Sequence, residues 1–295
     1  MAITKLADLH SHTTASDGLH APGEVVAMAV KAGLAAIAIT DHDTIAGVAE
    51  AQAAGMKLGI QIVPGVELST NAGGQDIHVL GYFTDNGNEQ WLSRLIRLRG
   101  GRSHRNEEIL SKLRQLGLPV QMADVHAAAM KRAGVGPESL SALTIGRPHI
   151  AQALIDNGFV SDMEEAFRVY LAEGAAAYVS QSRVHPLEAI GWIKEAGGVA
   201  VIAHPGLYGA DELVEELCRS GADGVEVFHS DHGPAEEKRY SAMAKRCGIL
   251  ETGGSDFHGL RGNQSYHGDL GSRNVPLSRV EELEALRRQP SASHL

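Results

Sequence analysis

The stretch from Asp8 to His12 carries two imidazoles, His10 and His12, separated by one residue. Alternate residues of a β-strand point to the same face, so both rings can reach a single cation. Histidine is the commonest metal ligand and binds as the neutral imidazole. The pair alone is also compatible with two exposed histidines near a chain terminus or with the remnant of a tag. The positions of the other histidines and carboxylates decide between these interpretations.

Seven further residues of metal-binding type follow or flank other predicted strands: Asp17, His42, Glu67, His78, His204, Asp256 and His258. Each has an ordinary explanation alone, such as a turn, a solvated carboxylate or the end of a strand. Together with His10 and His12 they provide six imidazoles and three carboxylates, more than one cation can use. Two or three metals are therefore predicted. A carboxylate such as Glu67 can bridge two cations ~3.5–4 Å apart, a spacing suited to displacement at phosphorus by a bridging hydroxide.

The elements that position these residues are short apolar runs alternating with helices. Seven strands are predicted, at residues 3–6, 35–40, 60–63, 77–82, 199–203, 224–228 and 249–252. The helices between them indicate a mostly parallel α/β sheet. Polar residues follow almost every strand, which is typical of a ring around a barrel mouth rather than of one switch point in an open sheet.

Residues 88–183 lack a convincing strand, and helical periodicity dominates them. A stretch this long between strands predicts a helical insertion subdomain, with the barrel made of residues 1–87 and 184–290. The first insertion helix is rich in arginine between Arg94 and Arg114. Such a helix either grips a polyphosphate or presents an ordinary solvated face.

Composition narrows the classes of partner. The 295 residues carry a net charge of −10, which argues against a large nucleic-acid-binding surface but allows a small basic pocket for one phosphate. No apolar run approaches the ~20 residues of a membrane span, and no signal peptide is visible. Two cysteines do not make a disulfide framework. We therefore expect a cytoplasmic enzyme with no membrane partner.

Several short motifs, in order along the chain, resemble the polymerase and histidinol phosphatase (PHP) family: His10-Ser11-His12, Thr40-Asp41-His42-Asp43, Gly65-Val66-Glu67, His78, Ala203-His204-Pro205 and Ser255-Asp256-Phe257-His258. The resemblance implies a distorted (β/α)7 barrel of PHP type with a trinuclear site holding manganese, or alternatively zinc or iron. The implied metal groups are His10, His12, Glu67 and Asp256; Glu67, His78 and His204; and Asp17, His42 and His258.

Within that family, the insertion and its segment from Gly146 to Ala151 resemble the 3',5'-nucleoside bisphosphate phosphatases. This branch removes the 3'-phosphate and leaves a nucleoside 5'-monophosphate, and some members trim short RNA from the 5' end. The resemblance makes Arg147 a candidate phosphate clamp, since guanidinium binds phosphate oxygens in a bidentate manner. The alternative is a surface arginine at a helix end. Leu207 departs from the branch, whose members often have arginine there.

Asp17, His204 and His229 are the candidate catalytic residues. His229 follows a strand, where it could protonate the leaving oxygen or bind a second phosphate of the substrate. A histidine hydrogen-bonded in a rim loop is the alternative. Asp8 shares the face of His10 and His12 and is expected to orient one of their imidazoles.

The sequence thus predicts a metal-dependent phosphoesterase that hydrolyses a phosphate monoester of a small nucleotide or short oligoribonucleotide. A cyclic-phosphate dihydrolase or a histidinol-phosphate-like phosphatase would use the same barrel. A C–N hydrolase of amidohydrolase type also uses His-x-His on a barrel strand, but no lysine follows a strand into the predicted mouth. A non-catalytic PHP module is the last alternative, and the complete ligand set argues against it.

Overall fold

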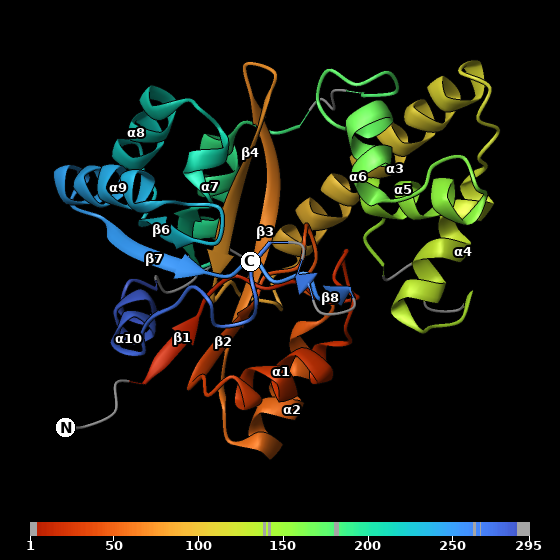
Figure 1. Cartoon of the computed structure of the whole chain (residues 1–295). Helices are drawn as coiled ribbons and strands as arrows, with labels where there is room; N and C mark the ends of the chain where they lie inside the picture. Colours follow the sequence, from red (N-terminus) through yellow and green to blue (C-terminus); the bar gives the residue numbers. More distant parts are fainter. Residues whose placement is uncertain are drawn as a thin grey trace.

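The computed structural model describes residues 5–137, 140, 143–179, 183–261, 264–265 and 267–287. Residues 288–290 of the predicted barrel segment lie outside the described residues. An eight-stranded sheet curls into a nearly closed barrel, in the order β10-β1-β2-β3-β4-β5-β6-β7 (Figure 1). Its strands are β1 (Leu6–Asp8), β2 (Ala36–Ile39), β3 (Gln61–Ala72), β4 (Gln75–Tyr82), β5 (Val199–Ile202), β6 (Gly224–His229), β7 (Leu250–Gly254) and β10 (Val275–Pro276).

The seam between β1 and β7 closes just beyond the strands themselves. The backbone N–H of Leu9 donates to the carbonyl of Gly253 at 3.1 Å, and Ser11 forms a parallel bridge with Phe257. A side chain at Gly254 would collide with the backbone nitrogen of His10. Only glycine therefore permits this close approach, which brings the segment after β7 beside the segment after β1.

Among β1 to β7, one strand runs against the others; β10, at the edge of the sheet, also pairs antiparallel, with β1. β4 pairs antiparallel with both β3 and β5, whereas the remaining pairs among β1 to β7 are parallel. The beginning of β4 therefore lies at the same end of the barrel as the carboxyl ends of the parallel strands. This orientation brings His78, near the start of β4, toward the barrel mouth.

Helices α1 (Pro22–Lys31), α2 (Val48–Leu58), α7 (Pro186–Glu195), α8 (Asp211–Arg219), α9 (Pro234–Cys247) and α10 (Ser278–Ala285) surround the barrel (Figure 1). Their apolar faces pack on buried strand residues, and β2 and β5 are apolar and buried along their whole length. A short hairpin of β8 (Leu260–Arg261) and β9 (Gln264–Ser265) follows β7. No helix in the described part of the chain is long and apolar enough to cross a membrane.

The insertion contains α3 (Glu89–Gln115), α4 (Met122–Ala133), α5 (Arg147–Asp156), α6 (Met163–Ala166) and the π-helical turn η2 (Phe167–Leu171). It has a core of its own, in which Ile109, Leu113, Ile150 and Leu154 are fully buried. The first half of α3 packs instead on the barrel core through Trp91, Leu95 and Leu98. The same helix therefore belongs to both parts, and the predicted domain boundaries at residues 88 and 183 stay a prediction.

Candidate metal centre

His10 and His12 lie on the extended segment after β1, with ring centroids 5.3 Å apart. The Nε2 atom of His10 lies 3.4 Å from Glu67 Oε2 and 3.3 Å from Asp256 Oδ1. The Nε2 atom of His12 lies 3.2 Å and 3.1 Å from the same two oxygens. These four side chains, from the ends of β1 and β7 and from within β3, therefore converge on one point as predicted.

Glu67 presents its two carboxylate oxygens to different groups of histidines. Oε1 lies 2.8 Å from His78 Nδ1 and 3.0 Å from His204 Nε2. Oε2 faces His10 and His12, and it also lies 3.1 Å from His42 Nδ1. One carboxylate oxygen on each side is the arrangement that a carboxylate bridging two cations requires.

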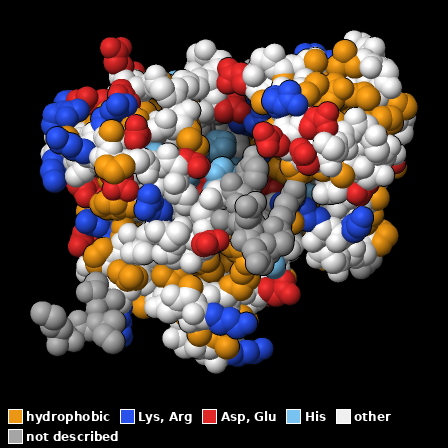
Figure 2. Space-filling view, in the orientation of Figure 1, with side chains coloured by type: hydrophobic (Ala, Val, Ile, Leu, Met, Phe, Trp, Pro, Cys, Tyr) orange, Lys and Arg blue, Asp and Glu red, His pale blue; other side chains and the backbone are white. Residues whose placement is uncertain are grey.

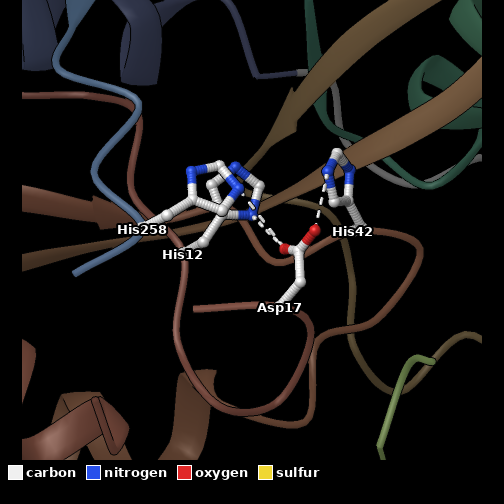
Figure 3. Close-up of side chains that lie close together, drawn as sticks. All are labelled: His12, Asp17, His42 and His258. Atoms are coloured by element: carbon white, nitrogen blue, oxygen red, sulfur yellow. Dashed lines mark ion pairs between the residues drawn. The ribbon is translucent and has the colours of Figure 1, made fainter. Parts of the chain in front are cut away.

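The third group surrounds the carboxylate of Asp17 (Figure 3). Its Oδ1 atom lies 3.4 Å from His258 Nε2 and 3.8 Å from His12 Nδ1, and its Oδ2 atom lies 3.9 Å from His42 Nε2. The loop that carries Asp17 is held by Asp41, which accepts hydrogen bonds from the Thr13 N–H at 2.8 Å and the Ser16 hydroxyl at 2.7 Å. The tertiary structure therefore brings eight of the nine predicted ligands into overlapping clusters, and His204 joins them through its contact with Glu67.

The donor atoms at the centre fit divalent cations because several are buried without a hydrogen-bond partner: His10 Nε2, His12 Nε2, His42 Nδ1, Asp17 Oδ1 and Asp256 Oδ1. Buried polar atoms normally find a partner, so such a set of donor atoms around one point fits a site for a divalent cation. His204 and Asp256 also adopt positive φ angles of 24° and 53°. Backbone strain of this kind in non-glycine residues concentrates at functional sites.

The ionisation of the carboxylates suits a metal centre. Burial disfavours the charged form of Glu67 and Asp17, but the surrounding histidines outweigh it and hold both pKa values well below their usual range. Burial lowers the pKa of His204 to about 4. Its imidazole is therefore neutral at pH 7, which is the form that binds metal.

The carboxylate that orients His10 is Glu226, not Asp8. Glu226 Oε1 lies 3.1 Å from His10 Nδ1, and its Oε2 accepts a hydrogen bond from the backbone N–H of His204 at 2.8 Å. The expectation for Asp8 is wrong, because its carboxylate accepts backbone N–H groups of His10, Ser255 and Gly271. A sequence signal for Glu226 existed: it is the one charged residue inside an apolar strand, Val225-Glu226-Val227.

His229 is completely buried behind the centre. Its Nε2 atom lies 3.4 Å from Asp256 Oδ2, and its Nδ1 atom accepts a hydrogen bond from the Asp231 N–H at 3.1 Å. It does not line the cavity described below. Asp231 also contacts His267 Nδ1 at 2.9 Å, and His267 does line the cavity. The loop position of His267 gave no signal in the sequence.

A cavity of about 210 Å³ opens over the centre, between the barrel and the insertion. Figure 2 shows histidine side chains at the base of this hollow. Asp17, His42, Glu67, His78 and His204 are among the barrel residues that line it. The insertion side is cationic, and the arginines that line the cavity are Arg102, Arg105, Arg132, Arg147 and Arg183.

Arg147, the predicted clamp, lies at this cavity with a quarter of its side chain exposed. Its Nη2 atom is 3.7 Å from Asp76 Oδ2, and its guanidinium carbon is 5.9 Å from the ring centre of Tyr178. The arginine-rich helix α3 was predicted either to grip a polyphosphate or to present an ordinary solvated face, and different parts of the helix fit each alternative. Arg94 and Arg97 stack on Trp192 of α7 at 5.0 and 4.9 Å, outside the cavity. Arg102 and Arg105, which follow one to three turns further along α3, line the cavity.

Comparisons with known proteins agree with a metal-dependent phosphoesterase barrel. The PHP domain family matches residues 8–172, more than half of the 295-residue chain, and the chain belongs to this family. A 3',5'-nucleoside bisphosphate phosphatase from Chromobacterium violaceum is 36% identical over 259 residues, which is 85% of this chain and 86% of the relative. A 5'-3' exoribonuclease from Haemophilus influenzae is 35% identical over 261 residues, covering 87% and 91% of the two chains.

A solved structure of a proposed metal-dependent phosphoesterase from Bifidobacterium adolescentis superposes with a TM-score of 0.85 at 31% identity, covering 96% of each chain. Family, fold and site together make this protein a metal-dependent phosphoesterase. The predicted PHP-type α/β barrel and the predicted enzyme class are thereby confirmed.

Proposed function

We propose that this phosphoesterase hydrolyses a phosphate monoester of a small nucleotide, with the 3'-phosphate of nucleoside 3',5'-bisphosphates as its main substrate. The observation that carries the proposal is the shared cavity, with carboxylates and imidazoles on the barrel side and arginines on the insertion side. Such a cavity can hold one phosphate at the centre and a second anionic group opposite. The bisphosphate phosphatase relative from C. violaceum supports the same substrate.

We propose that the nine predicted ligands hold two or three divalent cations, with manganese as the first choice and zinc or iron as alternatives. The proposed groups are His10, His12, Glu67 and Asp256; Glu67, His78 and His204; and Asp17, His42 and His258. The first and third are supported by clusters of donor atoms, and the second by the contacts of His78 and His204 with Glu67 Oε1. When bound, divalent cations stabilise negative charge on phosphoryl oxygens and lower the pKa of water. Measuring metal per chain in the purified protein by mass spectrometry tests both identity and number.

The chain's own residues would orient the reactants. Asp17 and His204 line the cavity, so both are proposed to position the attacking water and the phosphate against the centre. His229, proposed as the leaving-group acid or a ligand of a second phosphate, lies behind Asp256 and would need to move to reach either. Arg147 is proposed to bind phosphate, for which its guanidinium must leave Asp76.

A second candidate function is removal of nucleotides from the 5' end of short RNA, as the name of the H. influenzae relative suggests. The cavity volume of about 210 Å³ supports this second function, because ligand pockets usually measure ~300–1,000 Å³. A cavity this small encloses only part of a nucleotide and leaves the rest of a chain outside. The cytoplasmic location stays a prediction.

The test is a product-release screen with Mn²⁺ over five compounds: a nucleoside 3',5'-bisphosphate, a 5'-phosphorylated oligoribonucleotide, histidinol phosphate, a ribose cyclic phosphate and p-nitrophenyl phosphate. We expect the highest kcat/KM for the bisphosphate and no turnover after metal removal. A higher kcat/KM for any other compound would overturn the substrate proposal. Activity that survives complete metal removal would overturn the metal groups.

A further inference from the structure

Arg105 of α3 is a buried guanidinium with little to neutralise it. Its side chain is almost completely buried at the cavity, with 3% exposed. It donates one hydrogen bond, to Asn106 Oδ1 at 3.3 Å, and its Nε atom has no hydrogen-bond partner. Within the described part of the chain, no carboxylate oxygen lies within 4.0 Å of it.

The neighbours of Arg105 increase the imbalance. Burial and the nearby Arg102, Arg183 and Arg147 lower the pKa of Arg105 well below its usual range. A buried, unpaired charge is costly, and proteins retain one where a ligand supplies the counter-charge. The position of Arg105 on a cavity wall, rather than in a closed core, indicates that this counter-charge comes from a bound molecule.

The charges around Arg105 indicate which kind of molecule would bind there. Arg102 pairs with Asp43 at 2.5 Å. Arg147 and Arg183 share the single carboxylate of Asp76, at 3.7 and 3.1 Å. Among the residues that the structure describes, Arg105 has no such carboxylate, so it keeps a positive charge on the cavity wall that an anionic group such as a phosphate monoester can balance.

We propose that Arg105 is a specificity-determining residue that binds a second, non-reacting phosphate of the substrate. This inference rests on the proposed function only for the identity of the substrate. The carboxylate that acts most strongly on the charge of Arg105 is Asp76 rather than a carboxylate of the metal centre, so the proposed site is for a phosphate other than the reacting one.

The fold holds Arg105 in place before substrate arrives. The N-terminal half of α3 packs on the barrel core, and Arg102, one turn before Arg105, is paired with Asp43, the residue after His42. Arg102 also donates to the hydroxyl of Ser69 on β3. The distance between the two phosphate positions is therefore set by a continuous helix anchored beside the metal centre, which favours affinity because little ordering remains on binding.

The experiment compares Arg105→Met with Arg114→Met, an exposed arginine of the same helix, on two substrates. For a nucleoside 3',5'-bisphosphate we expect Arg105→Met to raise KM about 12- to 140-fold, the equivalent of the ~1.5–3 kcal/mol that a hydrogen bond to a charged group contributes. On p-nitrophenyl phosphate, which has one phosphate, kcat/KM should stay within about twofold. Arg105→Lys should recover part of the loss, and Arg114→Met should match the parent.

Equal losses on both substrates, or no loss on either, would overturn the proposal. A second measurement separates it from the proposed function. In metal-stripped protein, adenosine 5'-monophosphate should raise the melting temperature of the parent and of Arg114→Met, but not of Arg105→Met, and adenosine should raise none of them. If the parent shows this shift but cleaves no bisphosphate, only the proposed function fails. If Arg105→Met keeps the shift, the anion site fails.

Discussion

The two sides of the cavity differ in chemistry and in how the chain builds them. On the barrel side, imidazoles and carboxylates come from β3, β4 and the segments that follow other strands, and they pack into overlapping clusters. On the insertion side, the arginines come from three helices, α3, α4 and α5, and from the segment that contains Arg183. The barrel side therefore suits metals and the reacting phosphate, whereas the insertion side suits recognition of an anionic substrate. If this division is correct, variants on the two sides should change different kinetic parameters.

The largest effect is expected on the barrel side. Glu67→Gln removes the carboxylate whose two oxygens face different histidine groups. Phosphate release should fall about 1,000-fold or more for every substrate, since metal-assisted charge stabilisation contributes several kcal/mol and each 1.36 kcal/mol is about tenfold. Metal content per chain should fall as well. The control is Asp269→Asn, an exposed carboxylate, and equal activity of the two variants would contradict the bridging role.

The next effect concerns the carboxylate behind the centre. Glu226→Gln weakens the orientation of His10, and such partners of metal ligands typically contribute about 10–100-fold in metal affinity or activity. Excess Mn²⁺ should restore part of the activity, because the ligands themselves remain. Titration of activity against Mn²⁺ concentration measures this, with the exposed Glu212→Gln of α8 as control. An unchanged metal requirement would remove Glu226 from the site.

A smaller and more selective effect is expected on the insertion side. Arg147→Ala should raise KM for a nucleoside 3',5'-bisphosphate about tenfold and leave p-nitrophenyl phosphate almost unchanged. The effect is smaller than that of Arg105→Met because Arg147 is partly exposed and contacts Asp76. Steady-state kinetics on both compounds measures these two effects. A fall in kcat on p-nitrophenyl phosphate would show that the two sides are not separate.

We expect a substitution at His149 to have the smallest effect on activity and to change the stability of the fold instead. Its buried Nδ1 accepts a hydrogen bond from the Gly146 N–H at 3.0 Å, and burial lowers its pKa from 6.5 to about 4. The unfolded chain binds the proton more readily between these values, so stability is lost as pH falls from about 6.5 to about 4. The free energy of unfolding falls by about 3 kcal/mol, at ~1.36 kcal/mol for each pKa unit of the shift.

Denaturant unfolding at several pH values checks this, with His149→Gln as the comparison. The difference in unfolding free energy between the parent and the variant should shrink as pH falls, because glutamine does not titrate. A difference that stays constant from pH 7 to pH 4 would show that His149 takes up its proton without opposing the fold.

The metal centre was predictable because strand ends are a local property. An apolar run followed by His or Asp, as at His42, His204 and Asp256, marks a strand and the residue at its end. In a barrel of mostly parallel strands such ends meet at one mouth, so residues far apart in sequence had to converge. Glu226 was accessible to the same reasoning, as a charge inside an apolar strand.

The arginines were not predictable in this way. Seven basic residues crowd α3, and their spacing does not reveal which face of the helix turns toward the cavity. Packing of Trp91, Leu95 and Leu98 on the barrel sets the rotation of the helix, and this places Arg102 and Arg105 at the cavity but Arg94 on Trp192.

The sequence by itself thus indicated the barrel class, the nine candidate ligands and a helical insertion. The tertiary structure alone decided three matters. The antiparallel course of β4 brings His78, near the start of its strand, to the same mouth as residues after the other strands. The pairing of Glu226 rather than Asp8 with His10 depends on contact across the barrel. The burial of Arg105 depends on how the insertion packs, because exposure is a property of distant neighbours and not of local sequence.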